Sequence, residues 1–289
     1  MFTRREFVCA AGAAAAPRRL RLKHTRGEKV TVASGAAALL EYRYSALRPK
    51  PYIHPLCLAG GRAVTLDGPA DHVHHRGLMT AWSEVNGFDF WGEVNPAPHG
   101  RIVHREFERL REGPRAEIAA LNHWIAGGAL LLTERRTILV PPPSPDGVWL
   151  EWITELEAAV PVSLAAGKHH YNGLGIRFIR EMDGGSVVNS RGAASIEKAN
   201  GETAEWCAYS GGGAGVAFFD HPGNPRHPNA FFVMNKPFGY MSAAPTYRAP
   251  FPLGAGQSIR FRWGVLAFAG EPRIEALQRR FASWRREAR

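Results

Sequence analysis

Two stretches of alternating sequence decide the fold class: VWLEWITELE at residues 148–157 and IRFRWGV at residues 259–265. Apolar side chains alternate with glutamates in the first stretch and with arginines in the second. Because successive side chains of a β-strand point to opposite faces, the alternation predicts strands that each bury one face. We therefore expect two half-buried strands.

Similar runs recur along most of the chain and are separated by turns rich in glycine and proline. They lie near residues 29–34, 38–45, 62–66, 115–125, 129–140, 174–180, 204–209, 215–220 and 230–234. No nucleotide-binding glycine fingerprint, P-loop or repeat is present in the sequence. Only the C-terminus has a helical pattern. There Ile274, Leu277, Phe281 and Trp284 share one face, which predicts a helix packed against the edge of a sandwich.

Length and composition favour a single domain. The chain has 289 residues, of which 45% are hydrophobic, so it can bury a substantial core. No apolar run approaches the roughly 20 residues that a membrane span needs, so we do not expect an integral membrane segment.

The net charge of +10 is concentrated at the two ends of the chain. Residues 1–26 carry seven Arg and Lys against one Glu, and residues 271–289 carry six Arg against three Glu, which leaves +1 for residues 27–270. A nucleic-acid-binding protein needs its basic stripe on the folded surface. The distribution therefore argues against a nucleic-acid partner.

The N-terminus resembles an export signal. Thr3-Arg4-Arg5-Glu6-Phe7 precedes an Ala-rich stretch that ends at Ala16, which is the pattern of a twin-arginine signal. We therefore expect residues 1–26 to be an export signal and disordered leader, residues 27–289 to be the domain, and the protein to be periplasmic or secreted. Cys57 and Cys207 could pair in an oxidising compartment or be two separate buried thiols.

Three polar blocks carry the chemistry of the sequence, at residues 48–56, 67–78 and 85–93. The second block reads DGPADHVHHRGL and places three histidines within four positions. In an extended segment His72 and His74 point to one face and His75 to the other, so a metal-binding pair or a ligand-binding pair is possible. A polar loop with hydrogen-bonded histidines is the alternative, although burying so many polar groups without a ligand is costly.

These blocks resemble an uncharacterised family often labelled "methane oxygenase PmoA". The similar motifs are Pro-Tyr-Ile-His-Pro, Asp-His-x-His-His-Arg-Gly-Leu and Asn-Gly-x-Asp-Phe-Trp, and the resemblance continues through residues 221–229. It covers essentially the whole mature chain. A methane monooxygenase subunit is membrane-embedded, whereas this chain has no spanning run, so the label is a poor guide to function.

A more distant resemblance is to galactose mutarotases and related sugar epimerases. The segment HHYNGL at residues 169–174 is similar to their middle His-Tyr motif, and GVAFFD at residues 215–220 to the strand with their basic carboxylate. This resemblance implies an antiparallel supersandwich of roughly 15 or more strands. It also implies that His170 is a general acid and Asp220 a general base acting on one sugar. The groups that would position hydroxyls or a carboxylate are His72, His74, His75, Arg76 and Arg177.

Two departures from the mutarotase pattern favour a different reaction on the same scaffold. The late acid is Asp220 rather than Glu, and the early block has three histidines and Arg76 where mutarotases have a simpler His-Gly element. We therefore expect an exported carbohydrate-active protein, an isomerase, lyase or hydrolase with acid–base chemistry and a sugar-like ligand. A metal-dependent enzyme using His72, His74 and His170, or a noncatalytic carbohydrate-binding protein, are the alternatives. The sequence does not identify a cofactor.

Export makes a direct prediction. If the twin-arginine stretch is a signal, the mature protein secreted by a native-like host should begin between Ala14 and Arg19. N-terminal sequencing of the secreted protein measures this, and an intact Met1 on cytoplasmic protein would contradict it.

Overall fold

The computed structural model describes residues 19–94, 98–167 and 170–287, and it consists mostly of antiparallel strands. Its strands form three sheets, in which every strand pairing is antiparallel. The all-β, antiparallel class is therefore confirmed. The C-terminal helix is also present, together with one helix of four residues.

The first sheet carries the polar blocks. Its strands, in spatial order, are β1 (Leu20–Thr25), β2 (Lys29–Ser34), β3 (Ala37–Arg43), β4 (Tyr52–Leu56), β5 (Leu78–Trp82), β12 (Asn172–Arg177), β17 (Tyr240–Ala244) and β16 (Ala230–Met234).

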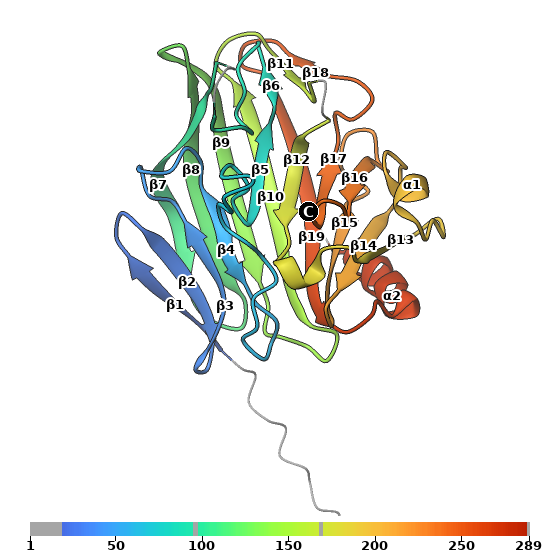
Figure 1. Ribbon diagram of the computed structural model, residues 1–289. Coiled ribbons are helices and arrows are strands. Elements are labelled where there is room, and N and C mark those ends of the chain that lie inside the picture. The colour runs from blue at the N-terminus through green and yellow to red at the C-terminus, as the bar shows by residue number, and fades with distance from the viewer. Residues whose placement is uncertain (1–18, 95–97, 168–169, 288–289) are drawn as a thin grey trace, which may run out of the picture.

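The second sheet lies behind the first in Figure 1. Its order is β13 (Ser186–Asn189), β14 (Trp206–Gly211), β15 (Ala214–Asp220), β19 (Ser258–Ala269), β10 (Val148–Ala158), β9 (Ala129–Val140), β8 (Ala116–Ala126) and β7 (Arg101–Arg111). A small third sheet contains β18 (Phe251–Leu253), β11 (Val162–Ala165) and β6 (Glu84–Val85). The helices are α1 (Ile196–Ala199), α2 (Ile274–Trp284) and the 3₁₀ turn Arg180–Met182.

The two stretches that predicted strands are direct neighbours. They form β10 and β19, in which Trp152 lies opposite Trp263 and Glu155 opposite Arg260. Trp152 and Trp263 belong to the main core, whereas Trp149 and Leu266 of the same strands face outward. The charged pair is favourable across an antiparallel ladder.

Aromatic contacts join the two large sheets. The ring of Trp82 on β5 lies 5.9 Å from that of Trp124 on β8 and 5.8 Å from that of Phe261 on β19. Trp82 therefore points into the sandwich interior. Because side chains alternate along a strand, the residues next to Trp82 in β5, and those paired with them on neighbouring strands, lie on the outer face of the first sheet.

Helix α2 covers the outer face of the second sheet. Leu277, Phe281 and Trp284 pack on Trp149 and Phe219 in a cluster separate from the main core. The helix had been expected at the sandwich edge. It lies on a face instead, because β10, β15 and β19 present large apolar side chains outward as well as inward.

A fully buried ion pair links the two sheets. Arg136 donates from Nε and Nη2 to the two carboxylate oxygens of Glu134, at 2.8 Å each. Trp124 and Thr154 donate to the same carboxylate, and Arg136 also donates from Nη1 to the carbonyl of Pro51, 3.0 Å away. Because Pro51 directly precedes β4, this bond ties the second sheet to the first.

Two expectations are corrected by the fold, and one open alternative is decided. Leu20–Thr25 forms β1, with Leu20 buried and bonded to Gly113, so these residues are part of the domain and not of a disordered leader. Residues 62–66 form isolated bridges rather than a strand. Cys57 and Cys207 are both buried and free, so they do not pair. Residues 1–18, which hold the twin-arginine stretch, lie outside the described residues.

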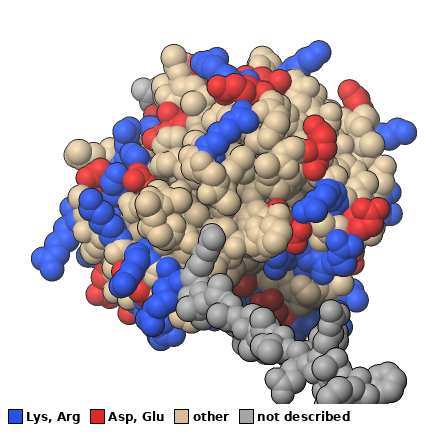
Figure 2. Space-filling view, turned by 90° about the horizontal axis from the view of Figure 1, so that it is seen from below, with Lys and Arg blue, Asp and Glu red and all other residues tan. Residues whose placement is uncertain are grey.

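The described surface mixes charges of both signs. On the face shown in Figure 2, basic and acidic side chains are interspersed around a broad area without charge. No helix in the described ranges is long and apolar enough to cross a bilayer.

The buried ion pair predicts a large loss of stability when one partner is removed. Arg136→Met leaves the Glu134 carboxylate buried without its counter-charge, so the free energy of unfolding should fall by about 3 to 5 kcal/mol. Arg21→Met, which breaks the exposed pair between Arg21 and Glu112, is the matched control and should cost less than about 1 kcal/mol. Urea unfolding measures both, and equal losses would contradict the prediction.

Candidate functional site

The site lies on the outer face of the first sheet, over β5, β12, β17 and β16. Gly175 on β12 has no side chain, which leaves room for two aromatic side chains to lie directly on the sheet. A Cβ at Gly175 would overlap the Tyr240 hydroxyl and would lie 2.6 Å from Cη2 of Trp91. A side chain at this position would therefore push both rings off the sheet.

Aromatic rings continue from Gly175 across the face. Trp91 and Tyr171 are stacked with centroids 5.6 Å apart and an interplanar angle of 15°. The edge of Tyr171 meets Phe232 at 5.4 Å, and Trp91 meets Tyr240 at 5.9 Å. Trp91 and Tyr240 are buried, whereas Tyr171 and Phe232 are half-buried and form the accessible rim.

The histidine block, which connects β4 to β5, is a succession of turns rather than an extended segment. The amide of His72 donates to the carbonyl of Pro69, and the amide of His75 donates to the carbonyl of His72, both at 2.9 Å. The three imidazoles therefore contact one another, and they do not divide between two faces. Ring centroids are 4.8 Å apart for His72 and His75, and 4.7 Å for His74 and His75.

Burial keeps the inner two histidines neutral at pH 7. It lowers the pKa of His74 to about 4, assisted by the positive charge of Lys50. It lowers the pKa of His75 to about 2, with His74 and His72 adding to the effect. The Nδ1 atom of His74 is buried and has no hydrogen-bond partner among the described atoms.

Arg177, at the end of β12, lies beside His75. Its Nη1 is 3.4 Å from Nδ1 of His75, its Nη2 donates to Asp71 at 3.2 Å, and its guanidinium carbon lies 3.8 Å above the ring of Phe238. Burial lowers the pKa of Arg177. The predicted ligand-binding residues His72, His74, His75 and Arg177 are thus brought together.

Arg76 supports the site from behind. It donates from Nε and Nη2 to the carboxylate of Glu93 and forms an ion pair with Asp67 at 3.5 Å. Lys50 donates to the same Glu93 at 2.8 Å and to the carbonyl of Trp91 at 2.7 Å. Arg76 therefore joins the polar blocks and positions them, and it does not line the cavity beside His74 that is described below.

The predicted acid and base are not part of this cluster. His170 has left-handed backbone geometry, its ring stacks on Tyr247 at 4.2 Å, and its Nδ1 donates to the carbonyl of Tyr247 at 3.1 Å. Asp220 is fully buried and lies opposite Trp263, on the interior face of the second sheet. The sandwich interior and the first sheet therefore lie between Asp220 and the histidines.

Asp220 instead holds the loop that follows β15. Its carboxylate accepts hydrogen bonds from the side chain of Asn224 at 2.6 Å, from Nδ1 of His227 at 2.8 Å, and from the amide of Asn229 at 2.9 Å. With its oxygens bonded in this way, the structure gives no geometric support to the acid–base pair of His170 and Asp220.

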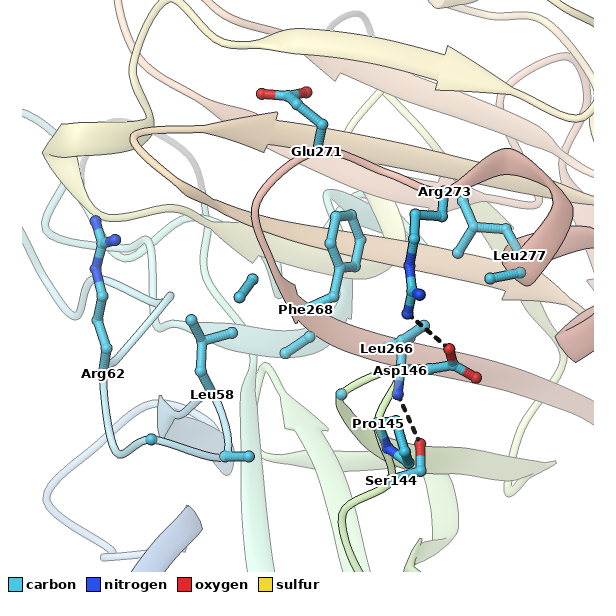
Figure 3. A pocket seen from close by; sticks show the side chains of 16 residues that line it. Leu58, Arg62, Ser144, Pro145, Asp146, Leu266, Phe268, Glu271, Arg273 and Leu277 are labelled. Atoms are coloured by element: carbon cyan, nitrogen blue, oxygen red, sulfur yellow. Dashed lines mark hydrogen bonds and ion pairs between the residues drawn. The ribbon is translucent and has the colours of Figure 1, made fainter.

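Two cavities differ in chemistry. One of about 410 Å³ adjoins the histidine cluster and is lined by His74, Ser83, Glu84, Gly87, Asp89, Trp91, Gly92, Val94, Gly167 and Tyr171. Another of about 460 Å³ lies between α2, β19 and two loops (Figure 3). The charged side chains of the second cavity already have partners in the protein. Arg273 bonds to Asp146 at 2.9 Å, Arg62 donates to the carbonyl of Gly212, and Glu271 accepts from Ser210. We therefore place the candidate site at the first.

A family model described as "Family of unknown function (DUF6807)" matches residues 29–282. The chain belongs to the DUF6807 family. That description contains no methane oxygenase, so the PmoA label of the sequence resemblance has no counterpart in the match. Curated proteins gave no match to this DUF6807 chain.

Solved structures similar to this DUF6807 chain are distant. Heparan sulfate lyase HepC from Pedobacter heparinus has 9% sequence identity and a TM-score of 0.40, and the alignment covers 84% of this chain and 34% of that chain. A putative aldose 1-epimerase from Escherichia coli K12 has 9% identity and a TM-score of 0.41, with coverage of 86% and 99%. A putative kojibiose phosphorylase from human microbiome has 9% identity and a TM-score of 0.36, with coverage of 94% and 36%. The chain thus spans about a third of the lyase's length.

The metal alternative gains no support from the side-chain arrangement of this DUF6807 protein. In the described ranges, no group of three or more His, Cys, Asp or Glu could hold a metal ion. Sequence reasoning missed Trp91, Tyr171 and Tyr240 as one cluster, because only the pairing of β5, β12 and β17 brings them together.

Gly175 gives a test of how the site is built. In Gly175→Ala the new methyl group displaces Tyr240 and Trp91, so the free energy of unfolding should fall by about 1 to 3 kcal/mol. The near-ultraviolet circular dichroism should change as well. Gly254→Ala is the control, since its Cβ would meet only the flexible Gln257 side chain, at 3.4 Å or more. A Gly175→Ala spectrum identical to the wild type would show that the rings do not depend on this glycine.

Proposed function

We propose that the DUF6807 protein is a carbohydrate-active enzyme whose ligand binds at the 410 Å³ cavity, with His74 as the group that accepts a proton. The observation that carries the proposal is the composition of this one wall. It places one imidazole nitrogen and one indole nitrogen, neither with a partner among the described residues, and a half-exposed phenol beside two carboxylates.

These groups match the surface of a sugar. A sugar ring has apolar faces that pack on aromatic rings, and hydroxyls around its edge that require hydrogen-bond partners. Tyr171 supplies an accessible ring, whereas the Nε1 of Trp91 is a buried donor that has no partner in the part of the chain that the structure describes. Glu84 and Asp89, which also line the cavity, supply acceptors.

His74 is suited to accept a proton because it is neutral and only partly exposed. Its Nδ1 is buried and has no partner among the described residues, so a ligand that reaches this atom would supply its missing hydrogen bond. A positioned base of this kind contributes roughly 10²- to 10⁴-fold to a rate. This assignment replaces the His170 and Asp220 pair implied by the mutarotase resemblance.

We also propose that the enzyme acts outside the cytoplasm. The support is the twin-arginine pattern before β1, which starts only at Leu20.

Kinetics on a defined panel tests the function. Purified protein incubated with mono- and disaccharides and their 3-keto derivatives should produce a new species by NMR. His74→Gln should slow that conversion by roughly 10²- to 10⁴-fold. Turnover of the wild type should fall as the pH drops through about 4, because His74 then takes up a proton.

The control is His104→Gln. Burial also lowers the pKa of His104 to about 4, but this residue lies on β7, away from the cavity, so turnover should be unchanged. If sugars bind but are not converted, the protein is a noncatalytic carbohydrate-binding protein and not an enzyme. Conversion abolished by chelators would favour the metal-dependent alternative.

A further inference from the structure

Arg177 is paired unlike the other buried arginines. Four arginines are buried within the described chain: Arg76, Arg136, Arg177 and Arg262. Arg136 is bonded twice to Glu134, Arg262 twice to Glu151, and Arg76 to Glu93 through two nitrogens. Each of these three carboxylates is buried or nearly so, with side-chain exposure of 5% or less.

The carboxylate beside Arg177 is of a different kind. Asp71 has a side chain that is 37% exposed, whereas Arg177 is 1% exposed. Asp71 is also shared, because it accepts from His72 at 3.1 Å and lies 3.5 Å from Arg180. Among the described residues, the carboxylate that is hydrogen-bonded to this buried guanidinium is thus an exposed one with competing partners, and Asp183 adds only a favourable charge nearby.

Hydrogen bonding at Arg177 is correspondingly incomplete. A guanidinium has five N–H donors. Those of Arg177 have two long contacts, to His75 at 3.4 Å and Asp71 at 3.2 Å, and its Nε is buried without a partner in the described structure. Buried charges and donors are normally paired, so this pattern indicates that the partner of Arg177 comes from outside the protein.

The position of Arg177 connects it to the proposed sugar site. It lies opposite Tyr240 on the neighbouring strand, and its contact His75 touches the ring of His74, which lines the cavity. A carboxylate bound at Arg177 would therefore be separated from the cavity wall by two contacting side chains, His75 and His74.

We infer that the ligand of this site is an acidic sugar, a uronate, whose carboxylate binds Arg177 in competition with Asp71. This inference rests on the proposed function and narrows its substrate class. Planar bidentate pairing of guanidinium and carboxylate is the interaction that Arg177 lacks and that a uronate supplies.

Binding of D-glucuronate and D-galacturonate, compared with D-glucose and D-galactose by saturation-transfer NMR and calorimetry, tests the inference. The uronates should bind roughly tenfold or more tightly than the neutral sugars, as expected for a charge-assisted pair. Arg177→Gln should reduce uronate affinity to that of the neutral sugars. Asp71→Asn should raise uronate affinity, because it removes the competing carboxylate.

Arg180→Gln is the control. Arg180 also pairs with Asp71, but it is 66% exposed, so uronate affinity should change by a factor of about two or less. Thermal unfolding verifies that each variant is folded. If Arg177→Gln does not fold, the uronate affinity of Asp71→Asn tests the inference by itself.

Each other result overturns a specific claim. Equal affinity for uronates and neutral sugars, a uronate preference that survives in Arg177→Gln, or weaker uronate binding by Asp71→Asn overturns the acidic-sugar inference and leaves the proposed function standing. If neither class of sugar binds, the proposed function itself fails.

Discussion

The site depends on the Glu93 carboxylate, which holds the three polar blocks together. It accepts from Lys50 and Arg76, which belong to two different polar blocks, and it lies in the third. Lys50 is adjacent to Pro51, whose carbonyl accepts from the buried Arg136 of the second sheet. The buried ion pair of the second sheet is therefore connected to the loop with the histidines through the Pro51 carbonyl, the Lys50–Pro51 peptide bond and the ion pairs of Glu93. Because these charges are buried, losing any one of them leaves its partners uncompensated, so the loops are fixed together rather than independently.

Much of the fold could be predicted from the sequence, because alternation reports directly which face of a strand is buried. The stretches that became β10 and β19 are the clearest cases. Prediction failed where the pattern was short or lost. Leu20–Thr25 was assigned to the leader since its charged residues hid a strand, and β5, buried at every position, has no alternation to detect.

The candidate site was predictable in part, and for a definite reason. His72, His74 and His75 are adjacent in sequence, so their clustering needed no long-range information. Asp220 shows the limit, because a carboxylate next to a proline-rich turn serves equally well as a catalytic base or as a loop anchor. Only the direct pairing of Asp220 with Trp263 places its side chain in the interior and settles which face it occupies.

The two large sheets differ in what covers their outer faces. Helix α2 packs on the outer face of the second sheet, whereas loops and aromatic rings cover that of the first. The candidate site and helix α2 therefore lie on opposite faces of the sandwich. A label or a solid support attached beyond α2 would lie behind the sandwich, and an immobilised protein would present its histidine cluster to the surrounding solution. A long polymer could then approach the cluster without passing the point of attachment.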